Sequence, residues 1–345
     1  MPSGCRPRRK PAGAIRRRCC PSRALMRQNP MIGPSPRWIR ISTTKWGSGW
    51  SRPTGLKRTV GGIPLREFTS LWNGSRPWII NRNRKGLLFF MNFNDYSDDI
   101  VFGFNTRTGG VSTGVYDSMN LSLTLPDDPE DVMKNYEIWC RDLGVRMQDL
   151  VIGLQTHTNN VVRVDERNKG QGLFRTRMKD VDGMVTNVPG VALVTYHADC
   201  TPVYLYDPVK KAIGMVHAGW RGTVKEIAGA AVRKLQTEFG TEPADLVAMI
   251  GPCISKEYFE CDRDVVDAVR AMNIPAEEMI SYDTVKNKYH VSIAGVNRLV
   301  LEAAGVPGDH IDMQDRCTYG NPSLFFSHRR DGLKRGGHCA LLMLR

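Results

Sequence analysis

The distribution of charge along the chain constrains its fold more than any other feature of the sequence. The chain has 48 Lys and Arg residues and 35 Asp and Glu residues, yet 20 of the basic residues and only Glu67 of the acidic ones lie in residues 1–90. A long segment with charges of one sign cannot pair its own charges, and it buries little apolar surface. We therefore expect a basic, disordered leader over residues 1–90 and a single folded domain over residues 91–345.

The leader has three interpretations. Arg-rich segments with few acids are typical of targeting presequences, and they are also typical of arms that bind nucleic acid. The third interpretation is that the leader is translated upstream DNA outside the native protein, which would then begin at Met91. We favour the third, because clustered Pro, Gly and Cys residues do not support the amphipathic helix of a presequence.

The composition of the chain excludes several classes of protein. Hydrophobic residues make up 41% and charged residues 24%, which are ordinary values for a globular protein and argue against a disordered, collagenous or coiled-coil chain. No run of eighteen apolar residues is present, so we expect no spanning helix. The six cysteines of residues 91–345 form no CxxC pair, which predicts free thiols in a reducing, cytoplasmic compartment.

Strand and helix signals alternate through the domain, which predicts an α/β fold. Asp128 followed by Pro129 is typical of a helix start, and Gly144 of a helix end, with apolar residues at helical spacing between them. We expect short strands over 150–154 and 161–164, a long β-type run over 191–206 and a further strand over 212–217.

The last two segments predict a hairpin with its loop at 207–211. If Tyr206 faces Ala212, antiparallel pairing places His217 opposite Thr201 and beside Cys200, within a slip of one or two residues. Cys200 and His217 are therefore expected to be neighbours in space.

A helix is predicted to follow this hairpin. Thr223 and Glu226 have the spacing of a capping box, and apolar residues then continue at helical period to Phe239. This places Arg221 at a helix N-terminus between two glycines, where a guanidinium and free backbone N–H groups favour an anion such as phosphate. The alternative is that Arg221 pairs with a surface acid and the glycines serve a tight turn.

Metal-ligating residues are few, because the chain contains only seven histidines. His157 lies in a polar turn after an apolar strand, and with Cys200 and His217 it would provide two imidazoles and a thiolate. Such a set suits zinc and leaves a fourth position open. His197 is a rival ligand, but its odd offset from Cys200 would place it on the opposite face of a regular strand.

Seven short motifs occur together in one order. They are Phe104-Asn-Thr-Arg107-Thr-Gly-Gly-Val-Ser112, Gln155-Thr-His157, Asp182-Gly-Met-Val-Thr186, Ala198-Asp-Cys200-Thr-Pro202, His217-Ala-Gly-Trp-Arg-Gly222, Ile250-Gly-Pro-Cys-Ile254 and Phe326-Ser-His-Arg-Arg-Asp-Gly332. From about residue 100 to the C-terminus the chain thereby resembles the purine nucleoside phosphorylase family once called laccase-domain or polyphenol oxidase proteins. Some bacterial members of that family are described as peptidoglycan editing factors.

The resemblance implies a four-layer α/β/β/α fold similar to the catalytic domain of cytotoxic necrotizing factors. It implies a zinc site at His157, Cys200 and His217, and Arg107 as a substrate- or phosphate-binding residue. The implied activity is phosphorolysis of adenosine, inosine, guanosine and S-methyl-5′-thioadenosine, together with deamination of adenosine. The implied partners are purine nucleosides and phosphate, with no nucleic acid or membrane; the oligomeric state is not implied.

The chemistry of the residues fits part of this. Deamination needs a carboxylate that moves protons near the metal, for which Asp199 is our candidate; a structural role capping the Cys200 turn is the alternative. Phosphorolysis needs a held phosphate, for which Arg221 is placed.

Two other enzyme classes are alternatives to a zinc-dependent phosphorylase. A cysteine hydrolase with Cys200 as nucleophile and His217 as base is chemically reasonable, and it could be a peptidoglycan-precursor editing amidase. Seven histidines without a His-x-His pair argue against a copper polyphenol oxidase.

Overall fold

The computed structural model describes residues 59–60, 63–64, 87–88 and 95–345. The chain divides into two compact units, Met1–Asn73 and Gly74–Arg345. Within the first unit the described residues form β1 (Thr59–Val60) and β2 (Ile63–Pro64), which pair antiparallel. The predictions about the leader fall almost entirely outside the described residues, and the boundary at residue 90 stays a prediction. The remaining description concerns the second unit.

Two sheets form the centre of this unit. The six-stranded sheet has the order β15-β11-β9-β10-β7-β6, and the five-stranded sheet has the order β3-β4-β16-β8-β5. The strands of the first are β6 (Val161–Arg163), β7 (Gly183–Thr186), β9 (Thr201–Asp207), β10 (Ala212–Ala218), β11 (Val247–Ile250) and β15 (Ile311–Met313). The strands of the second are β3 (Leu87–Leu88), β4 (Ile100–Asn105), β5 (Leu150–Ile152), β8 (Ala192–His197) and β16 (His338–Leu344).

The two sheets face each other across an apolar core. Alternate residues of each strand point into this core, as the period of two in a β-strand requires. Phe102 and Phe104 of β4 meet Tyr204 and Tyr206 of β9 in one buried cluster. The neighbouring residues of these strands belong to other clusters, on the outer faces of the sheets.

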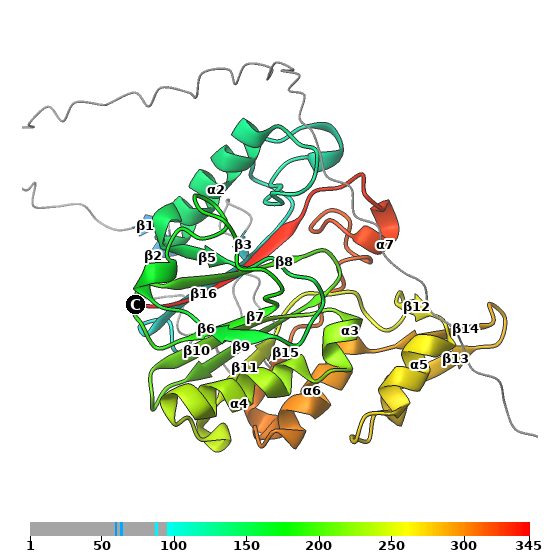
Figure 1. Cartoon of the computed structure of the whole chain (residues 1–345). Coiled ribbons are helices and arrows are strands. Elements are labelled where there is room, and N and C mark those ends of the chain that lie inside the picture. The colour runs from blue at the N-terminus through cyan, green and yellow to red at the C-terminus, as the bar shows by residue number, and fades with distance from the viewer. Residues whose placement is uncertain (1–58, 61–62, 65–86, 89–94) are drawn as a thin grey trace, which may run out of the picture. The chain divides into compact units, whose positions relative to one another are not determined.

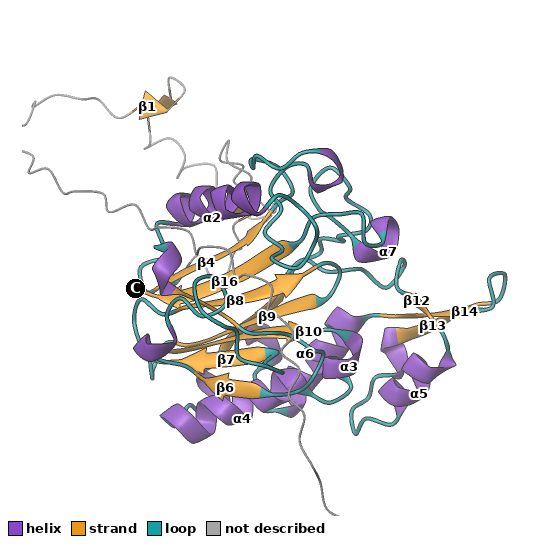
Figure 2. Cartoon of the chain, turned by 45° about the horizontal axis from the view of Figure 1, so that its top comes forward, coloured by secondary structure: helices purple, strands orange, loops and turns teal. Residues whose placement is uncertain are grey.

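Helices cover both outer faces, as Figures 1 and 2 show. The helix α2 (Pro129–Leu143) packs Tyr136 and Trp139 on the five-stranded sheet. The helices α4 (Ile227–Phe239) and α6 (Ile293–Ala303) cover the six-stranded sheet. The layers therefore follow the order α/β/β/α, which agrees with the mixed α/β fold expected from the sequence.

A small sheet lies apart from these layers. It has the order β12-β14-β13 and carries the helix α5 (Arg263–Arg270) against it. Its strands are β12 (Glu260–Cys261), β13 (Ile280–Asp283) and β14 (Lys288–Val291). None of the helices in the described ranges is long and apolar enough to cross a membrane.

The first predicted helix is confirmed. Asp128 is the N-cap of α2 and its side chain accepts a hydrogen bond from the Glu130 N–H at 2.8 Å. Gly144 ends the helix in the left-handed conformation, at φ 71°. A carboxylate cap and a glycine C-cap are local devices, so the sequence predicts both ends of this helix correctly.

The long β-type run over 191–206 is two strands that belong to different sheets. β8 lies in the five-stranded sheet and β9 in the six-stranded sheet, and the turn at 198–200 crosses between them. The predicted hairpin between β9 and β10 is present, but its register differs by one residue. Ala212 pairs with Asp207, so His217 faces Pro202 rather than Thr201.

The predicted capping box at Thr223 is wrong. Thr223 is the last residue of a four-residue helix, α3 (Trp220–Thr223), and its buried hydroxyl accepts a hydrogen bond from the Asn297 amide. α4 begins after Glu226, which is in the left-handed conformation at φ 57°. Packing of α3 against α6 thus overrides a local capping signal, and Arg221 lies within the short helix instead of ahead of a long one.

Candidate active site

The site lies where the chain crosses from one central sheet to the other. The segment between β5 and β6 makes one crossing and holds His157, and the turn between β8 and β9 makes a second and holds Cys200. His217 is near the end of β10, on the side of that strand that faces the inner core. Two connections between the sheets and one strand end therefore bring the three residues together, although His157 and His217 are 60 residues apart in the sequence.

A buried aspartate that the sequence analysis did not single out shapes this site. Asp182 precedes β7 and is fully buried. Its Oδ1 accepts hydrogen bonds from His217 Nδ1 at 2.8 Å and the His157 N–H at 3.1 Å. Its Oδ2 accepts from the N–H groups of Thr156 and Thr158 and from the Thr158 hydroxyl. One carboxylate thus holds both the turn that carries His157 and the ring of His217.

The contact with Asp182 determines which nitrogen of His217 is available. Because the carboxylate engages Nδ1, Nε2 is the ring nitrogen that is left for a metal ion, which would take the place of its proton. His157 is held at φ 63°, an uncommon conformation for a residue with a side chain. The hydrogen bonds that its backbone and its neighbours donate to Asp182 stabilise that conformation.

Three donor atoms converge at this point. The ligating atoms of His157, Cys200 and His217 all lie within 4.8 Å of one another, and His157 Nε2 is 3.8 Å from Cys200 Sγ. Gly219 closes one side: a Cβ there would lie 2.5 Å from His157 Cδ2 and 3.1 Å from Cys200 Sγ. Two imidazoles and a thiolate around a space without a fourth protein ligand fit zinc at an open site.

The charges of these groups are coupled. Burial alone would raise the pKa of the Cys200 thiol, but the neighbouring His217 and His157 imidazoles lower it below its usual range. Burial alone would lower the pKa of His217, but Cys200 and Asp182 raise it instead. Burial alone would likewise raise the pKa of Asp182, but the hydrogen bonds from His217 and Thr158 and the charge of His217 together lower it below its usual range. Cys200 is therefore a thiolate at neutral pH, the form that binds metal.

A cavity of about 520 Å³ opens beside the three donor atoms. Apolar side chains form much of its wall, and charged or polar side chains form the rest. The apolar ones include Trp220, Ile254, Phe259, Val265 and Ile293. The charged or polar ones include Arg221, Glu260, Asp262, Asp264, His328 and Arg329. This volume is within the range of small-molecule sites.

Asp199 lines the cavity, but its carboxylate is occupied. Oδ1 accepts a hydrogen bond from the Thr318 hydroxyl at 2.6 Å. Oδ2 accepts from the Ser327 hydroxyl at 3.0 Å and from the Arg329 N–H at 2.7 Å. The side chain thereby ties the β8–β9 turn to the segment before and within α7 (His328–Asp331). The sequence left two roles open for Asp199, a structural one and proton transfer, and these bonds support the structural one.

His197 is next to the site without facing the three donor atoms. Its Nε2 lies 2.8 Å from the Thr195 hydroxyl and its Nδ1 lies 3.0 Å from the Cys200 carbonyl oxygen. Burial and the nearby His217 lower its pKa well below the usual value, so the ring is neutral. The sequence predicted from strand alternation that His197 would face away from Cys200. The reason is different, because residues 198–200 form a turn, to which strand alternation does not apply.

The two arginines predicted to bind substrate or phosphate lie in different places. Arg221 lines the cavity, with its guanidinium carbon 4.3 Å from the centre of the Trp220 ring. Arg107 is outside the set of described residues that line the cavity. Its guanidinium donates to the carbonyl oxygens of Asp117 and Pro322 and lies over the Phe326 ring.

Sequence reasoning missed Asp182, Gly219 and the wall that the β12–α5 segment contributes. Asp182 and Gly219 both lie inside motifs that the sequence analysis quoted, so a signal was present, but no spacing rule gives their roles. The wall residues Phe259 and Val265 carry no motif, and only the packing of the small sheet places them at the cavity.

Comparison with known proteins gives relatives for most of the chain. A protein of Bacillus subtilis strain 168 named purine nucleoside phosphorylase YlmD is 39% identical over 245 residues, covering 70% of this chain and 88% of the relative. A protein from an unknown prokaryotic organism named adenosine deaminase RL5 is 32% identical over 239 residues, covering 68% and 91%. The crystal structure of YlmD from Geobacillus stearothermophilus superposes with a TM-score of 0.73 at 35% identity, covering 78% of this chain and all of that one.

The family model described as multi-copper polyphenol oxidoreductase laccase matches residues 101–345, which include every residue of the site. The relatives named purine nucleoside phosphorylase and adenosine deaminase are at least 30% identical over more than two thirds of the chain. On these matches, the chain belongs to the laccase-like polyphenol oxidoreductase family, which the motifs had indicated.

Proposed function

We propose that this protein is a zinc-dependent purine nucleoside phosphorylase that also deaminates adenosine. The observation that carries the proposal is the convergence of His157, Cys200 and His217 beside a cavity of nucleoside size. The names of the relatives support the choice of reaction. The proposed substrates are adenosine, inosine, guanosine and S-methyl-5′-thioadenosine, with phosphate as the second substrate.

His157, Cys200 and His217 would hold the metal. A zinc ion bound there would supply Lewis-acid chemistry, polarising a substrate oxygen or lowering the pKa of a water molecule. Asp182 keeps the Nδ1 proton on His217 and thereby keeps Nε2 directed at the metal position. Gly219 leaves the space that the three ligands need.

The cavity offers a separate place for each part of a nucleoside. Trp220, Phe259 and Ile293 form an apolar wall that suits the face of a purine. In phosphorolysis a phosphate oxygen forms a bond to C1′ of the ribose while the bond from C1′ to N9 of the purine breaks, and positive charge develops on the sugar. We propose that Arg221, which lines the cavity, helps to hold that phosphate. Arg107 is proposed to act at a distance, by holding the loop that ends at Pro322.

Asp199 is assigned a smaller part. Its two oxygens already accept three hydrogen bonds, so it is a poor proton acceptor unless the loop moves. The predicted proton transfer by Asp199 stays a prediction, and Asp199→Asn tests it. If Asp199 moves protons, this variant loses deamination, because an amide cannot take up a proton.

The test combines metal analysis with product analysis. Wild type and Cys200→Ala are compared for zinc content and for turnover of adenosine with and without phosphate. We expect about one zinc per chain in the wild type, none in the variant, and adenine with ribose 1-phosphate only when phosphate is present. Inosine without adenine would leave a deaminase. No zinc and no turnover of any nucleoside would refute the proposal.

One observation favours a second candidate, a cysteine hydrolase. Cys200, His217 and Asp182 have the order of a thiol, an imidazole and a carboxylate that orients the imidazole. Such an enzyme could be the peptidoglycan-precursor editing amidase. It would keep its activity after treatment with a zinc chelator, whereas the phosphorylase would lose it.

Copper is not part of the proposal, although the family description mentions it. Among the residues that the structure describes, one group of His, Cys, Asp and Glu side chains could hold a metal ion, and it has three members. A multicopper centre needs several such groups close together. The cytoplasmic location and the likeness to cytotoxic necrotizing factors stay predictions.

A further inference from the structure

Arg335 is a charged side chain with few partners among the residues that the structure describes. It is half-buried, and its one hydrogen bond within that part of the chain runs from Nη1 to the carbonyl oxygen of the adjacent Gly336, at 2.8 Å. Its buried Nε has no partner there. A guanidinium has five N–H donors, and leaving such donors unsatisfied away from water costs free energy. An arginine kept in this state is suited to bind an anion.

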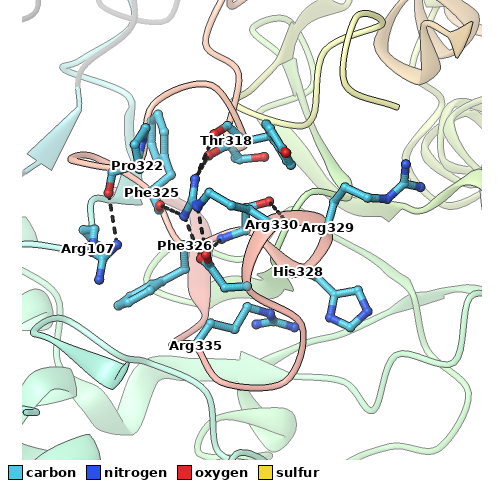
Figure 3. A network of polar contacts seen from close by, with 12 residues as sticks. Arg107, Thr318, Pro322, Phe325, Phe326, His328, Arg329, Arg330 and Arg335 are labelled. Carbon is cyan, nitrogen blue, oxygen red and sulfur yellow. Dashed lines mark hydrogen bonds and ion pairs between the residues drawn. The ribbon is translucent and has the colours of Figure 1, made fainter. Parts of the chain in front are cut away.

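The neighbouring arginines differ in this respect, as Figure 3 shows. Arg330 donates to the carbonyl oxygens of Thr318, Tyr319 and Phe325 and pairs with Asp331. Arg107 and Arg329 likewise donate to backbone carbonyl oxygens. The N–H donors of these three side chains hold loops together, whereas most N–H donors of Arg335 make no hydrogen bond within the described residues.

The acids near Arg335 are already engaged. Asp199 accepts hydrogen bonds from Thr318, Ser327 and the Arg329 N–H, and Asp331 pairs with Arg330. Burial lowers the pKa of Arg335, and the charges of Asp199, Cys200 and Asp331 oppose that shift. Neither acid forms an ion pair with Arg335 in the described part of the chain.

Arg335 is outside the set of described residues that line the cavity, but it lies next to that set. Its side chain extends toward His328 in Figure 3, and His328 lines the cavity together with Arg329. The negative charges of Cys200 and Asp199, which also line the cavity, act on the guanidinium. The segment between α7 and β16 therefore brings this cation near residues that line the cavity.

We propose that Arg335 is an anion-binding residue of this site and that its ligand is the phosphate ion consumed in the reaction. The inference rests on the proposed function and names the residue that holds its second substrate. The planar guanidinium fork matches two phosphate oxygens, and its free donors fit that arrangement. Arg221, which lines the cavity, would then help to attract the anion, and Arg335 would bind it.

The experiment uses the full-length, metal-loaded protein and inorganic phosphate as the probe. Phosphate should raise the melting temperature of the wild type, because a ligand that binds the folded state stabilises it. Arg335→Gln should lose this response without melting earlier in the absence of phosphate. The variant should also raise the KM for phosphate by roughly 10- to 100-fold, the loss expected for charge-assisted hydrogen bonds. The KM for the nucleoside should be unchanged.

Two further variants separate specific binding from general electrostatics. Lys334→Gln removes one positive charge from the adjacent, exposed position, and we expect it to behave as the wild type. Arg335→Lys keeps the charge without the fork and should show an intermediate KM for phosphate. It also keeps the test decisive if the glutamine variant folds poorly.

The possible outcomes point to different conclusions. If the wild type uses phosphate and Arg335→Gln has an unchanged KM for it, the inference is wrong and the proposed function stands. If the wild type neither binds phosphate nor cleaves any nucleoside, both are wrong. If Arg335→Gln loses binding of adenosine 5′-monophosphate but keeps that of inorganic phosphate, the ligand is a phosphate ester and the proposed ion is wrong.

Discussion

The substitution Asp182→Asn tests the proposed organisation of the site most directly. Asp182 accepts five hydrogen bonds, from His217 Nδ1, from the N–H groups of Thr156, His157 and Thr158, and from the Thr158 hydroxyl. Asparagine has nearly the same shape but only one oxygen. Its NH₂ group would face donors in either orientation, so at least two N–H groups lose their acceptor, of which only that of His217 is fully buried.

The magnitude follows from that count. A buried N–H without an acceptor costs roughly 1–3 kcal/mol, and a partly exposed one costs less because water replaces the acceptor, so we expect a loss of roughly 1–3 kcal/mol of unfolding free energy. If the NH₂ group faces His217, the ring must also change tautomer, which places a proton on the Nε2 atom that would bind the metal. Loss of such a supporting contact typically reduces metal affinity by about 10- to 100-fold.

The assay measures stability and metal affinity separately. Urea unfolding gives the first, and zinc competition against a chromogenic chelator gives the second. Asp180→Asn is the matched control. Asp180 is two residues away and exposed, and within the described residues its carboxylate accepts one hydrogen bond, from the Thr156 hydroxyl. Asparagine also tolerates the left-handed conformation of that position, φ 56°. An Asp182→Asn protein with the zinc affinity and the stability of the Asp180→Asn control would refute the reasoning.

Three further predictions concern the space around the ligands, pH and a helix end. Gly219→Ala should lower zinc affinity at least about tenfold, since its Cβ would press on His157. Gly214→Ala is the control, because its Cβ would make ordinary contacts of 3.4 Å, and it should leave zinc affinity unchanged. The same chelator competition measures both affinities. Burial would raise the pKa of Asp149, but its hydrogen bonds from a neighbouring arginine and lysine lower it overall. The stability it provides is therefore present above about pH 4, the unfolded pKa, and is lost as pH falls through the lower folded pKa. Urea unfolding should show Asp149→Asn less stable than wild type at pH 7 and the difference shrinking below pH 4; an equal difference at both pH values would contradict this. Asp128→Ala should cost about 1 kcal/mol in thermal or urea unfolding, because the N-cap bond is lost, and no change would mean that the cap is redundant.

Local signals in the sequence were sufficient for some elements. Both ends of α2 are specified by residues within one turn of the helix, so Asp128 and Gly144 could be recognised without knowing the fold. The hairpin loop was recognised for the same reason, although it begins one residue later than predicted because Asp207 still belongs to β9. His157 was chosen because it lies in a polar turn after a strand, Cys200 and His217 because the predicted hairpin makes them neighbours, and the family motifs narrowed that choice.

The same local rules failed where tertiary contacts decide. Thr223 and Glu226 have the spacing of a capping box, yet Thr223 is used to accept a hydrogen bond from Asn297, 74 residues away. The apolar run at 191–206 carries no mark of where it leaves one sheet for the other, because both strands are buried and have the same period. The register of the hairpin differed by one residue, since loop residues alone do not specify it.

The sequence by itself determined the composition of the site: which imidazoles and which thiolate are available, and that glycines accompany them. Only the tertiary structure decided their geometry. Asp182 is 25 residues from His157 and 35 from His217, and one carboxylate orients both because the turn that carries His157, the start of β7 and the end of β10 meet in the fold. The unused guanidinium of Arg335 is likewise visible only in the fold, because whether a cation has partners depends on segments that the chain brings together from far apart.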